Sequence, residues 1–473
     1  MVFSSTIFLT LFLPIVFGLY CISSLPYRKW LLLLFSLLFY AWGEPKAVIC
    51  LLVISISNFY IGEIIYRSNN QTAKLVLIVA LLGDIGALFF YKYLNFSIAN
   101  INLVFGTGWK IPGIELPIGI SFYCFQCVSY LIDVYKREVE PQRSLSNFML
   151  YVSFFPQLIA GPIVRYIDIK DQLEDRALNL ENVYNGLIRF TIGLAKKVLI
   201  ADPNGFVADK VFALPPQDVS QSWCWIGVIC YGLQIYFDFS AYSDMAIGLA
   251  RVFNFRFLEN FKHPYHSFSV QEFWRKWHIS LSSWLRDYVY IPLGGSRRGP
   301  LHTYMNIWIV FLLCGLWHGA EWTFVLWGAW HGFGLTLERL GLNKVLEYFH
   351  PVVRILWVWL FVLVGWVLFR SPDFAYACKF LKNLFGFGNE ELSFITNIQL
   401  YSNLNISLVL SFFIGLLLMF DYSGTKLYLR ITSSVYQSSK IYFIFNLIVA
   451  FLFLISVTFA VTSNFSPFIY FRF

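Results

Sequence analysis

The sequence predicts an all-α membrane protein that crosses the bilayer many times. Hydrophobic residues make up 58% of the 473 residues and charged residues only 13%, whereas a soluble chain carries about 25% charged residues. The apolar runs are continuous, unlike the alternating segments of roughly 10 residues that form a membrane β-barrel. This composition excludes an ordinary soluble enzyme, a secreted disulfide scaffold and a disordered chain. Helices then remain as the way to satisfy backbone hydrogen bonds inside lipid.

Long apolar windows, each a candidate helix, occur along the whole chain, at residues 6–24, 30–43, 46–66, 74–94, 114–134, 146–163, 184–201, 223–250, 303–317, 321–340, 352–370, 404–421 and 441–462. A full crossing needs about 20 residues, so the shorter windows predict partial helices, and we expect about nine to twelve helices. Two windows are interrupted by Pro117, Gly119, Pro156, Gly161 and Pro162. This predicts broken helices that are buried in protein or line a cavity. We expect a single membrane domain over 1–473, without internal symmetry.

The first window indicates a membrane span rather than a signal peptide. No Lys or Arg precedes residues 6–24, and no small-residue cleavage site follows them. The first positive charges, Arg28 and Lys29, come after it. The positive-inside rule therefore predicts that this loop is cytosolic and that the N-terminus is outside.

Residues 251–300 form a basic, aromatic-rich segment within this domain. Eight Lys and Arg side chains stand there against three carboxylates. Aromatic rings interleaved with positive charges are typical of a membrane–water interface. One interpretation is an interfacial cytosolic loop, and a compatible one is a mouth that clamps the phosphates of a donor molecule. The candidate donor-binding residues are Arg275, Lys276, Arg286, Trp274, Trp277 and Trp317.

Three of the seven histidines lie in aromatic contexts: His278 in Trp-His-Ile-Ser, and His318 and His331 in two Trp-His-Gly units. A neutral imidazole in such a place is a good general base; a hydrogen-bonded packing histidine is the alternative. Gly319 removes a side chain beside His318, so we expect a ligand to approach there. Thirteen residues correspond to about 220° around an unbroken helix, so His318 and His331 converge only if the helix breaks. His278, on another element, is free to approach either.

Two acids in an apolar stretch, Asp238 and Asp244, are further candidates because ionisable groups inside a membrane are expensive. Their six-residue offset is about 120° around a helix, so they are not expected to form a carboxylate pair. The alternative interpretation is that each acid is structural and pairs with an arginine such as Arg251 or Arg275.

Several other chemistries lack their signatures. His263 and His266 form a histidine pair without the cysteines or the HExxH frame of a zinc site, so no metal is expected. Cys124 and Cys127 form a lone CxxC in an apolar stretch and are expected to be buried thiols. No GxSxG, P-loop or dinucleotide motif is present. The positive charges lie in short loops, so nucleic acid is not an expected partner. Acid–base chemistry or plain transport remains.

A set of motifs in one order extends over nearly the whole chain, and through it the chain resembles a known family. The motifs are Leu116-Pro-Ile-Gly-Ile-Ser-Phe-Tyr, Phe155-Pro-Gln-Leu-Ile-Ala-Gly-Pro, Tyr236-Phe-Asp-Phe-Ser-Ala-Tyr-Ser-Asp-Met, Phe273-Trp-Arg-Lys-Trp-His-Ile-Ser, Leu293-Gly-Gly and Leu316-Trp-His-Gly. In them the chain resembles the membrane-bound O-acyltransferase (MBOAT) family, and within it the bacterial membrane subunits that O-acetylate alginate.

The resemblance implies a ring of helices around a thin centre, with funnels on both faces, in the bacterial cytoplasmic (inner) membrane. It implies that His318 is the essential histidine, that His278 is a second functional histidine, and that His331 matches a further motif histidine. It also implies an extracytoplasmic partner resembling SGNH hydrolases and a polysaccharide acceptor. No bound cofactor is expected; the donor substrate is acetyl-CoA or another acetyl thioester.

The expected reaction is movement of an acetyl group from a cytosolic thioester across the membrane, for O-acetylation of an extracytoplasmic polysaccharide such as alginate. His318 would take the proton of the acceptor hydroxyl, while His278, Asn306 or a backbone N–H would stabilise the oxyanion. Three alternatives stay open: peptidoglycan O-acetylation, D-alanyl transfer from a carrier protein, and a non-enzymatic scaffold for polymer export.

Overall fold

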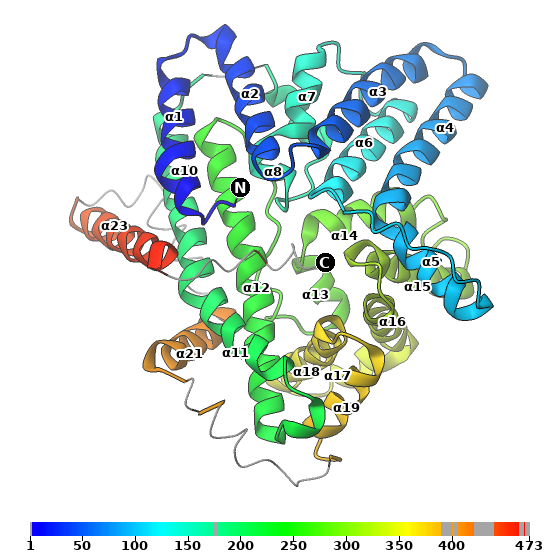
Figure 1. The fold of residues 1–473 in the computed structure, drawn as a ribbon, viewed down its shortest axis with the longest axis vertical. Coiled ribbons are helices and arrows are strands. Elements are labelled where there is room, and N and C mark those ends of the chain that lie inside the picture. Colours follow the sequence, from blue (N-terminus) through cyan, green and yellow to red (C-terminus); the bar gives the residue numbers. More distant parts are fainter. Residues whose placement is uncertain are drawn as a thin grey trace. The chain divides into compact units, whose positions relative to one another are not determined.

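The computed structural model describes residues 2–174, 177–388, 400–401, 404–420, 439–462 and 468, and these form helices and loops without a β-strand. Contacts within the chain divide it into two compact units, here called unit 1 and unit 2 (Figure 1). Unit 1 comprises Met1–Phe190 and Tyr242–Glu259, and unit 2 comprises Thr191–Ala241 and Asn260–Phe473. The single domain expected over 1–473 stays a prediction.

Within the described residues, six helical segments are long and apolar enough to cross a membrane: Ala47–Arg67, Asn70–Phe105, Gln221–Val252, Pro300–His318, Pro351–Arg370 and Tyr442–Thr462. Three shorter apolar segments are Phe8–Ile22, Ile120–Tyr135 and Ile406–Phe420. Each falls on an apolar window of the sequence. The all-α polytopic membrane class is therefore confirmed, while the ring of helices with two funnels stays a prediction.

Unit 1 is built mainly from the N-terminal helices, α1 (Leu13–Ile22), α2 (Leu25–Gly43), α3 (Ala47–Arg67), α4 (Asn70–Leu88), α5 (Leu94–Phe105), α6 (Ile120–Tyr135), α7 (Leu145–Ser153), α8 (Phe155–Leu158) and α9 (Tyr166–Ile169). Helices α3, α4 and α6 pack against one another (Figure 1). Pro156 lies in the first turn of α8, where its missing N–H costs nothing. The window 146–163 is thus broken into α7 and α8 within the stretch that its prolines and glycines marked.

Unit 2 holds the later helices, α11 (Asp202–Phe212), α13 (Val270–Lys276), α14 (Ile279–Leu285), α15 (Pro300–His318), α16 (Trp322–Leu337), α17 (Asn343–Leu346), α18 (Pro351–Arg370), α19 (Phe374–Leu384), α21 (Ile406–Phe420) and α23 (Ser439–Thr462). Helices α10 (Leu180–Ala195) and α12 (Gln221–Val252) contribute residues to both units. Short π or 3₁₀ segments join them, η1 (Phe8–Phe12), η2 (Phe89–Tyr93), η3 (Lys170–Gln172), η4 (Lys196–Ala201), η5 (Pro216–Asp218), η6 (Arg286–Tyr290) and η7 (Glu338–Leu342).

The closest helix pair in unit 2 is α15 with α16, which are separated by only three residues. Two glycines permit the close approach of their backbones. A Cβ added to Gly315 would overlap the carbonyl oxygen of Phe324, and one added to Gly328 would overlap that of Phe311. Helix α16 also packs against α13 and α18. This group of four helices carries most of the candidate site.

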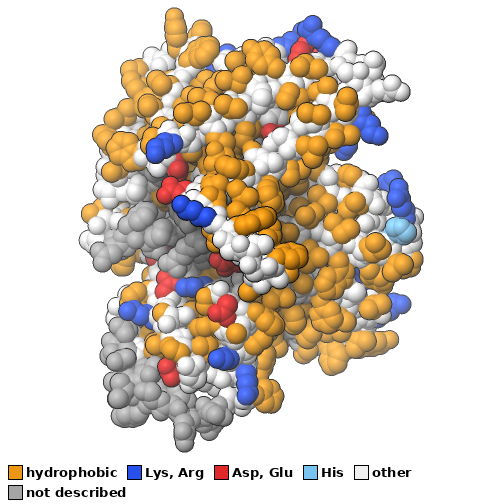
Figure 2. All heavy atoms as spheres, turned by 45° about the vertical axis from the view of Figure 1, so that its right-hand side comes forward, with side chains coloured by type: hydrophobic (Ala, Val, Ile, Leu, Met, Phe, Trp, Pro, Cys, Tyr) orange, Lys and Arg blue, Asp and Glu red, His pale blue; other side chains and the backbone are white. Residues whose placement is uncertain are grey.

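The surface of several helices is apolar, as expected for contact with lipid. Figure 2 shows hydrophobic side chains over much of one face, with charged side chains in small groups between them. On α4 the side chains of Leu75, Val79 and Leu82 are more than three-fifths exposed, and on α23 Phe451 and Leu454 are exposed to the same degree. Exposed apolar surface on this scale marks a membrane or partner contact.

Candidate active site

Three buried histidines gather in unit 2 around two tryptophans. The exposed fraction is 2% for His278, 4% for His318 and 0% for His331. The His278 ring lies 6.0 Å from that of Trp317, and the His318 ring lies 5.0 Å from the rings of both Trp317 and Trp327. The His331 ring lies 4.9 Å from Trp327. The two indole rings therefore lie between the three imidazoles and contact all of them. Each of the three histidines belongs to one of the Trp-His motifs identified in the sequence.

The break between α15 and α16 brings His318 and His331 together. Helix α15 ends at His318, and α16 begins at Trp322. The chain turns back within residues 319–321, so the 220° separation of an unbroken helix does not apply. Both histidines contact the same indole, Trp327. The sequence predicts that His318 and His331 converge only if the helix between them breaks, and the helix does break.

The space beside His318 is filled by protein. A Cβ added to Gly319 would overlap the ring of Phe324. Phe324 packs on Phe369 at 4.8 Å, and the Phe369 ring lies 5.2 Å from that of His318. Gly319 therefore accommodates Phe324, and the expected ligand approach at that glycine is wrong. The rings in contact with His318 are Trp317, Trp327 and Phe369.

His331 accepts a hydrogen bond from Trp274. The indole Nε1–H of Trp274, on α13, donates to Nδ1 of His331 over 3.1 Å. A neutral imidazole that accepts at Nδ1 carries its proton on Nε2. That nitrogen faces α18, where a Cβ added to Gly365 would lie 3.2 Å from it. Trp274, predicted to bind the donor, is thus buried against a histidine.

His278 occupies a strained turn between α13 and α14. Its φ is +44°, in the left-handed region that non-glycine residues rarely adopt and that occurs often at functional sites. Its Nδ1 lies 3.3 Å from Oδ1 of Asn260. Burial lowers the pKa of His278 to about 3, because an apolar environment disfavours the charged ring. The imidazole is therefore neutral near pH 7.

Asp238 lies in a buried ion pair in unit 2. Lys197, on η4, approaches Asp238 at 2.9 Å and Asp202 at 2.7 Å. The side chains of Lys197 and Asp238 are 4% and 1% exposed. The structural interpretation of this acid fits the pairing, but the expected arginine partner is wrong.

Asp244 is paired in unit 1 with an arginine, as the structural interpretation expected, although this arginine is neither of the two named as examples. Arg189, on α10, contacts Asp244 at 2.8 Å and Glu259 at 2.5 Å. Arg251, one of the expected partners, instead donates from Nε to Oδ1 of Asn182 at 3.2 Å. The two acids thus belong to different charge clusters, in agreement with the expectation that they do not form a pair.

Asn306 ties down the turn before α15. Its Nδ2 donates to the carbonyl oxygen of Gly295 at 2.9 Å and more weakly to that of Leu293 at 3.4 Å. An oxyanion would have to compete with these carbonyls for the same amide protons. This geometry gives the proposed oxyanion role of Asn306 no support.

The candidate donor-binding cations differ in whether they form ion pairs within the protein. Lys276 forms an ion pair with Glu272 at 2.7 Å, and Arg286 forms one with Asp287 at 2.7 Å. The side chain of Arg275 is exposed, and no ion pair is formed by it within the described residues. Trp277 and Trp317 are buried and are part of the aromatic packing. Arg275 is therefore the best placed of these residues to meet a ligand from outside.

The remaining candidate metal ligands do not assemble. In the part of the chain that the structure describes, no three His, Cys, Asp or Glu side chains gather as a metal site. Cys124 and Cys127 are buried free thiols on α6.

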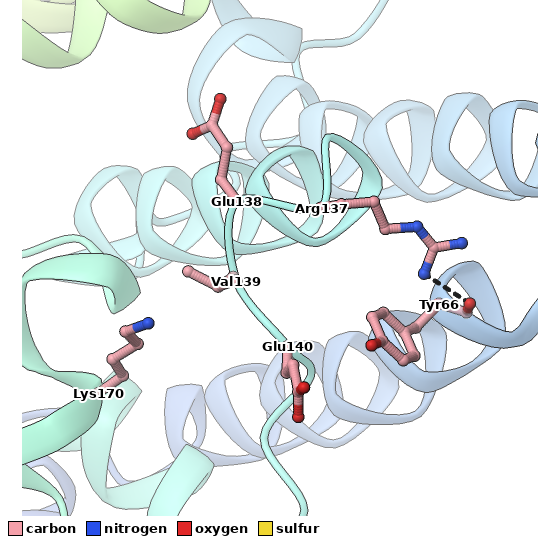
Figure 3. Close-up of a pocket in the computed structure, with 6 residues that line it drawn as sticks. All are labelled: Tyr66, Arg137, Glu138, Val139, Glu140 and Lys170. Carbon is pink, nitrogen blue, oxygen red and sulfur yellow. Dashed lines mark hydrogen bonds between the residues drawn. The ribbon is translucent and has the colours of Figure 1, made fainter.

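Unit 1 contains a polar pocket of about 490 Å³ that the sequence did not suggest (Figure 3). Arg137 donates from Nη1 to the carbonyl oxygen of Tyr66 at 2.6 Å and lies over the Tyr66 ring. Lys170 extends toward the pocket from the side opposite Arg137 (Figure 3). The other lining residues are Glu138, Val139 and Glu140. Tyr66 lies at the end of α3, residues 137–140 follow α6, and Lys170 begins η3, so the lining combines two cations with two carboxylates.

Fold and site together define a polytopic α-helical membrane protein with histidines buried in an aromatic shell. The model of the MBOAT, membrane-bound O-acyltransferase family matches residues 138–376, which include all three histidines. The chain belongs to this family, and it is a membrane O-acyltransferase.

Curated relatives cover most of the chain. It is 44% identical over 407 residues to a probable alginate O-acetylase of Pseudomonas putida, covering 85% of this chain and 83% of the relative. It is 35% identical over 429 residues to a peptidoglycan O-acetyltransferase of Helicobacter pylori, covering 83% and 81%. A teichoic acid D-alanyltransferase of Bacillus subtilis is 27% identical over 43% of this chain and 53% of the relative.

Proposed function

We propose that the protein is an O-acetyltransferase of the bacterial inner membrane, which moves an acetyl group from a cytosolic thioester to an extracytoplasmic polysaccharide such as alginate. The observation that carries this proposal is the 44% identity with a probable alginate O-acetylase over 85% of the chain. The buried cluster of three imidazoles is consistent with acid–base chemistry on a hydroxyl acceptor.

In the proposed reaction His318 is the base. Its imidazole takes the proton of the acceptor hydroxyl, and the oxygen attacks the carbonyl carbon of the thioester. The C–O bond forms as the C–S bond breaks, and the imidazolium returns the proton to the leaving thiolate. Acetyl-CoA is the proposed donor, and no bound cofactor takes part. His318 is only 4% exposed and is surrounded by the rings of Trp317, Trp327 and Phe369, and such apolar surroundings strengthen the electrostatic interactions of the transition state.

The charged part of the donor stays outside the bilayer in this proposal. The basic residues of 251–300, among them the exposed Arg275, hold the phosphates on the cytosolic side. Only the acyl thioester arm then reaches His318, so no phosphate enters lipid, where charge is costly. An extracytoplasmic partner resembling SGNH hydrolases would place the acetyl group on the polymer.

The test is to replace His318 by alanine and to measure the acetyl content of the secreted polymer. We expect acetylation to be lost while the amount of inserted protein and of secreted polymer stays unchanged. His302→Ala is the matched control, because His302 is an exposed histidine on the same helix. Wild-type acetylation in His318→Ala would refute the role of this residue, and loss of polymer secretion would favour the export scaffold.

Peptidoglycan is the second candidate acceptor. The relative named a peptidoglycan O-acetyltransferase is 35% identical over 83% of the chain, so its coverage is nearly that of the alginate relative. Acetyl content of cell-wall muropeptides and of exopolysaccharide, measured in a deletion strain, separates the two acceptors. Labelled acetyl and alanyl donors, compared on the same membranes, test D-alanyl transfer.

A further inference from the structure

Asn260 forms several hydrogen bonds with the strained turn that contains His278. Its backbone carbonyl accepts from the N–H of Ile279 at 2.9 Å. Its side-chain Oδ1 accepts from the backbone N–H of Ser280 at 3.1 Å and from the Ser280 hydroxyl at 2.9 Å. The same oxygen lies 3.3 Å from Nδ1 of His278. One residue therefore holds three successive residues of the turn.

These contacts determine which nitrogen of His278 carries the proton. The backbone N–H of Ser280 is a donor only, so the amide atom of Asn260 that faces it has to be the oxygen. The Ser280 hydroxyl also lies 3.5 Å from Nδ1 of His278, but its single proton goes to Asn260 Oδ1 over the shorter distance of 2.9 Å. An amide oxygen only accepts, so Nδ1 of His278 has to donate to it. In the neutral ring the proton then lies on Nδ1, and Nε2 holds a lone pair.

The nitrogen with the lone pair is buried and unused. Within the described residues, Nε2 of His278 has no hydrogen-bond partner, although a buried acceptor without a partner is costly. The rings in contact with His278 are Phe239 of α12, Phe261 and Trp317 of α15, and none of them is titratable. A strained, buried side chain with one satisfied and one unsatisfied nitrogen is what a substrate-binding histidine requires.

We propose that Asn260 is a positioning residue that holds His278 with its proton on Nδ1, so that Nε2 accepts a hydrogen bond from a hydroxyl group of the acyl acceptor. This inference rests on the proposed function, and it separates His278 from the base, His318. It also reverses the oxyanion role expected for His278, because a neutral ring held in this way has no proton on Nε2 to donate. His331 is held in the opposite form, with its proton on Nε2, by Trp274.

The tautomer is tested directly by nitrogen NMR of protein labelled with ¹⁵N-histidine, in which a protonated ring nitrogen is distinguished from a bare one. Resonances lost in His278→Gln belong to His278. We expect a protonated Nδ1 and a bare Nε2 at neutral pH, and we expect Asn260→Ala to change that pattern. A protonated Nε2 in the wild-type protein would overturn the proposal. This readout does not depend on catalysis, so it stands apart from a failure of the proposed function.

A pH profile tests the positioning role. In wild type, burial keeps the pKa of His278 low, so its lone pair is present throughout the range of an ordinary assay. Asn260→Asp keeps the acceptor but places a carboxylate against Nδ1–H, which favours the imidazolium and raises the pKa. KM for the acceptor should then rise as the pH falls through this raised pKa. A purely structural role predicts a KM profile for Asn260→Asp that superimposes on that of wild type.

Substitution of the histidine tests the hydrogen bond itself. Gln at 278 retains an acceptor near the position of Nε2, whereas Phe removes it. We expect His278→Phe to raise the acceptor KM about tenfold, the equivalent of one buried hydrogen bond, and His278→Gln to recover part of that loss. Asn204→Ala is the matched control for Asn260→Ala, because Asn204 is another buried asparagine of unit 2, bonded to Ile200 and Ser411. Equal KM values in the Phe and Gln variants would contradict the proposal.

Discussion

The indole nitrogen of Trp274 and Nδ1 of His331 lie 3.1 Å apart in a hydrogen bond that joins α13 to α16. Both side chains are buried. The bond uses the lone pair of Nδ1, and the remaining proton of the neutral ring lies on Nε2, which faces the backbone at Gly365. A histidine held in this way is a hydrogen-bond donor and a link between helices, and it is poorly suited to take a proton.

The bond can be measured with a double-mutant cycle. Trp274→Phe leaves Nδ1 of His331 buried without a donor, which should cost about 1–3 kcal/mol of stability. His331→Phe in the same background removes the unsatisfied acceptor, so the double variant should lose less than the sum of the two single variants. Thermal unfolding in detergent measures each free-energy change. Additive effects would show that the two side chains are not coupled.

The packing at Gly319 gives a second prediction. A methyl group there displaces the ring of Phe324, which packs on Phe369 beside His318. Gly319→Ala should therefore lower stability by about 1–3 kcal/mol, as overpacking does, and reduce acetyl transfer through the moved aromatic shell. Phe324→Leu in the same chain should restore part of both. If the second substitution worsens the first, the proposed collision is not the cause.

Hydrophobic windows predicted the helices well because each helix that crosses a membrane has to be apolar over about 20 residues, whatever its neighbours are. The break after His318 falls between the apolar windows 303–317 and 321–340, so the sequence separated the two helices. It did not predict that α16 folds back on α15 and brings His318 and His331 to the same indole. The three histidines were found from their motifs, and the structure adds the indoles of Trp317 and Trp327 that connect them.

The hydrogen-bond and ion-pair partners of the candidate site residues could not be predicted from the sequence. Lys197 lies 41 residues from Asp238, and Asn260 lies 18 residues from His278, so no helical spacing relates either pair. A single asparagine in a loop also has no distinctive local pattern. Arg251 and Arg275 were named as examples of partners for the buried acids, whereas the partners found are Lys197 of η4 and Arg189 of α10.

The buried pair of Lys197 and Asp238 predicts a strongly asymmetric response to substitution. Lys197→Met leaves the carboxylate of Asp238 buried without its cation, which should cost about 3–5 kcal/mol. Lys197→Met combined with Asp238→Leu removes both charges and should recover much of that loss. Thermal unfolding of purified protein compares the two. A double variant as unstable as Lys197→Met would mean that Asp202, which also contacts Lys197, dominates the cluster.

Arg275 gives the prediction for donor binding. Its side chain is exposed, so Arg275→Gln should leave stability unchanged and raise KM for the thioester donor about tenfold through loss of a charge-assisted phosphate contact. The effect should shrink at high salt, because ions screen an exposed charge. Arg339→Gln is the control, an exposed arginine of unit 2 outside the basic segment. Transfer from acetyl-CoA and from a short acetyl thioester without phosphates should be compared in both variants. Only the phosphate-bearing donor should distinguish Arg275→Gln from wild type; equal losses with both donors would exclude a phosphate contact at this residue.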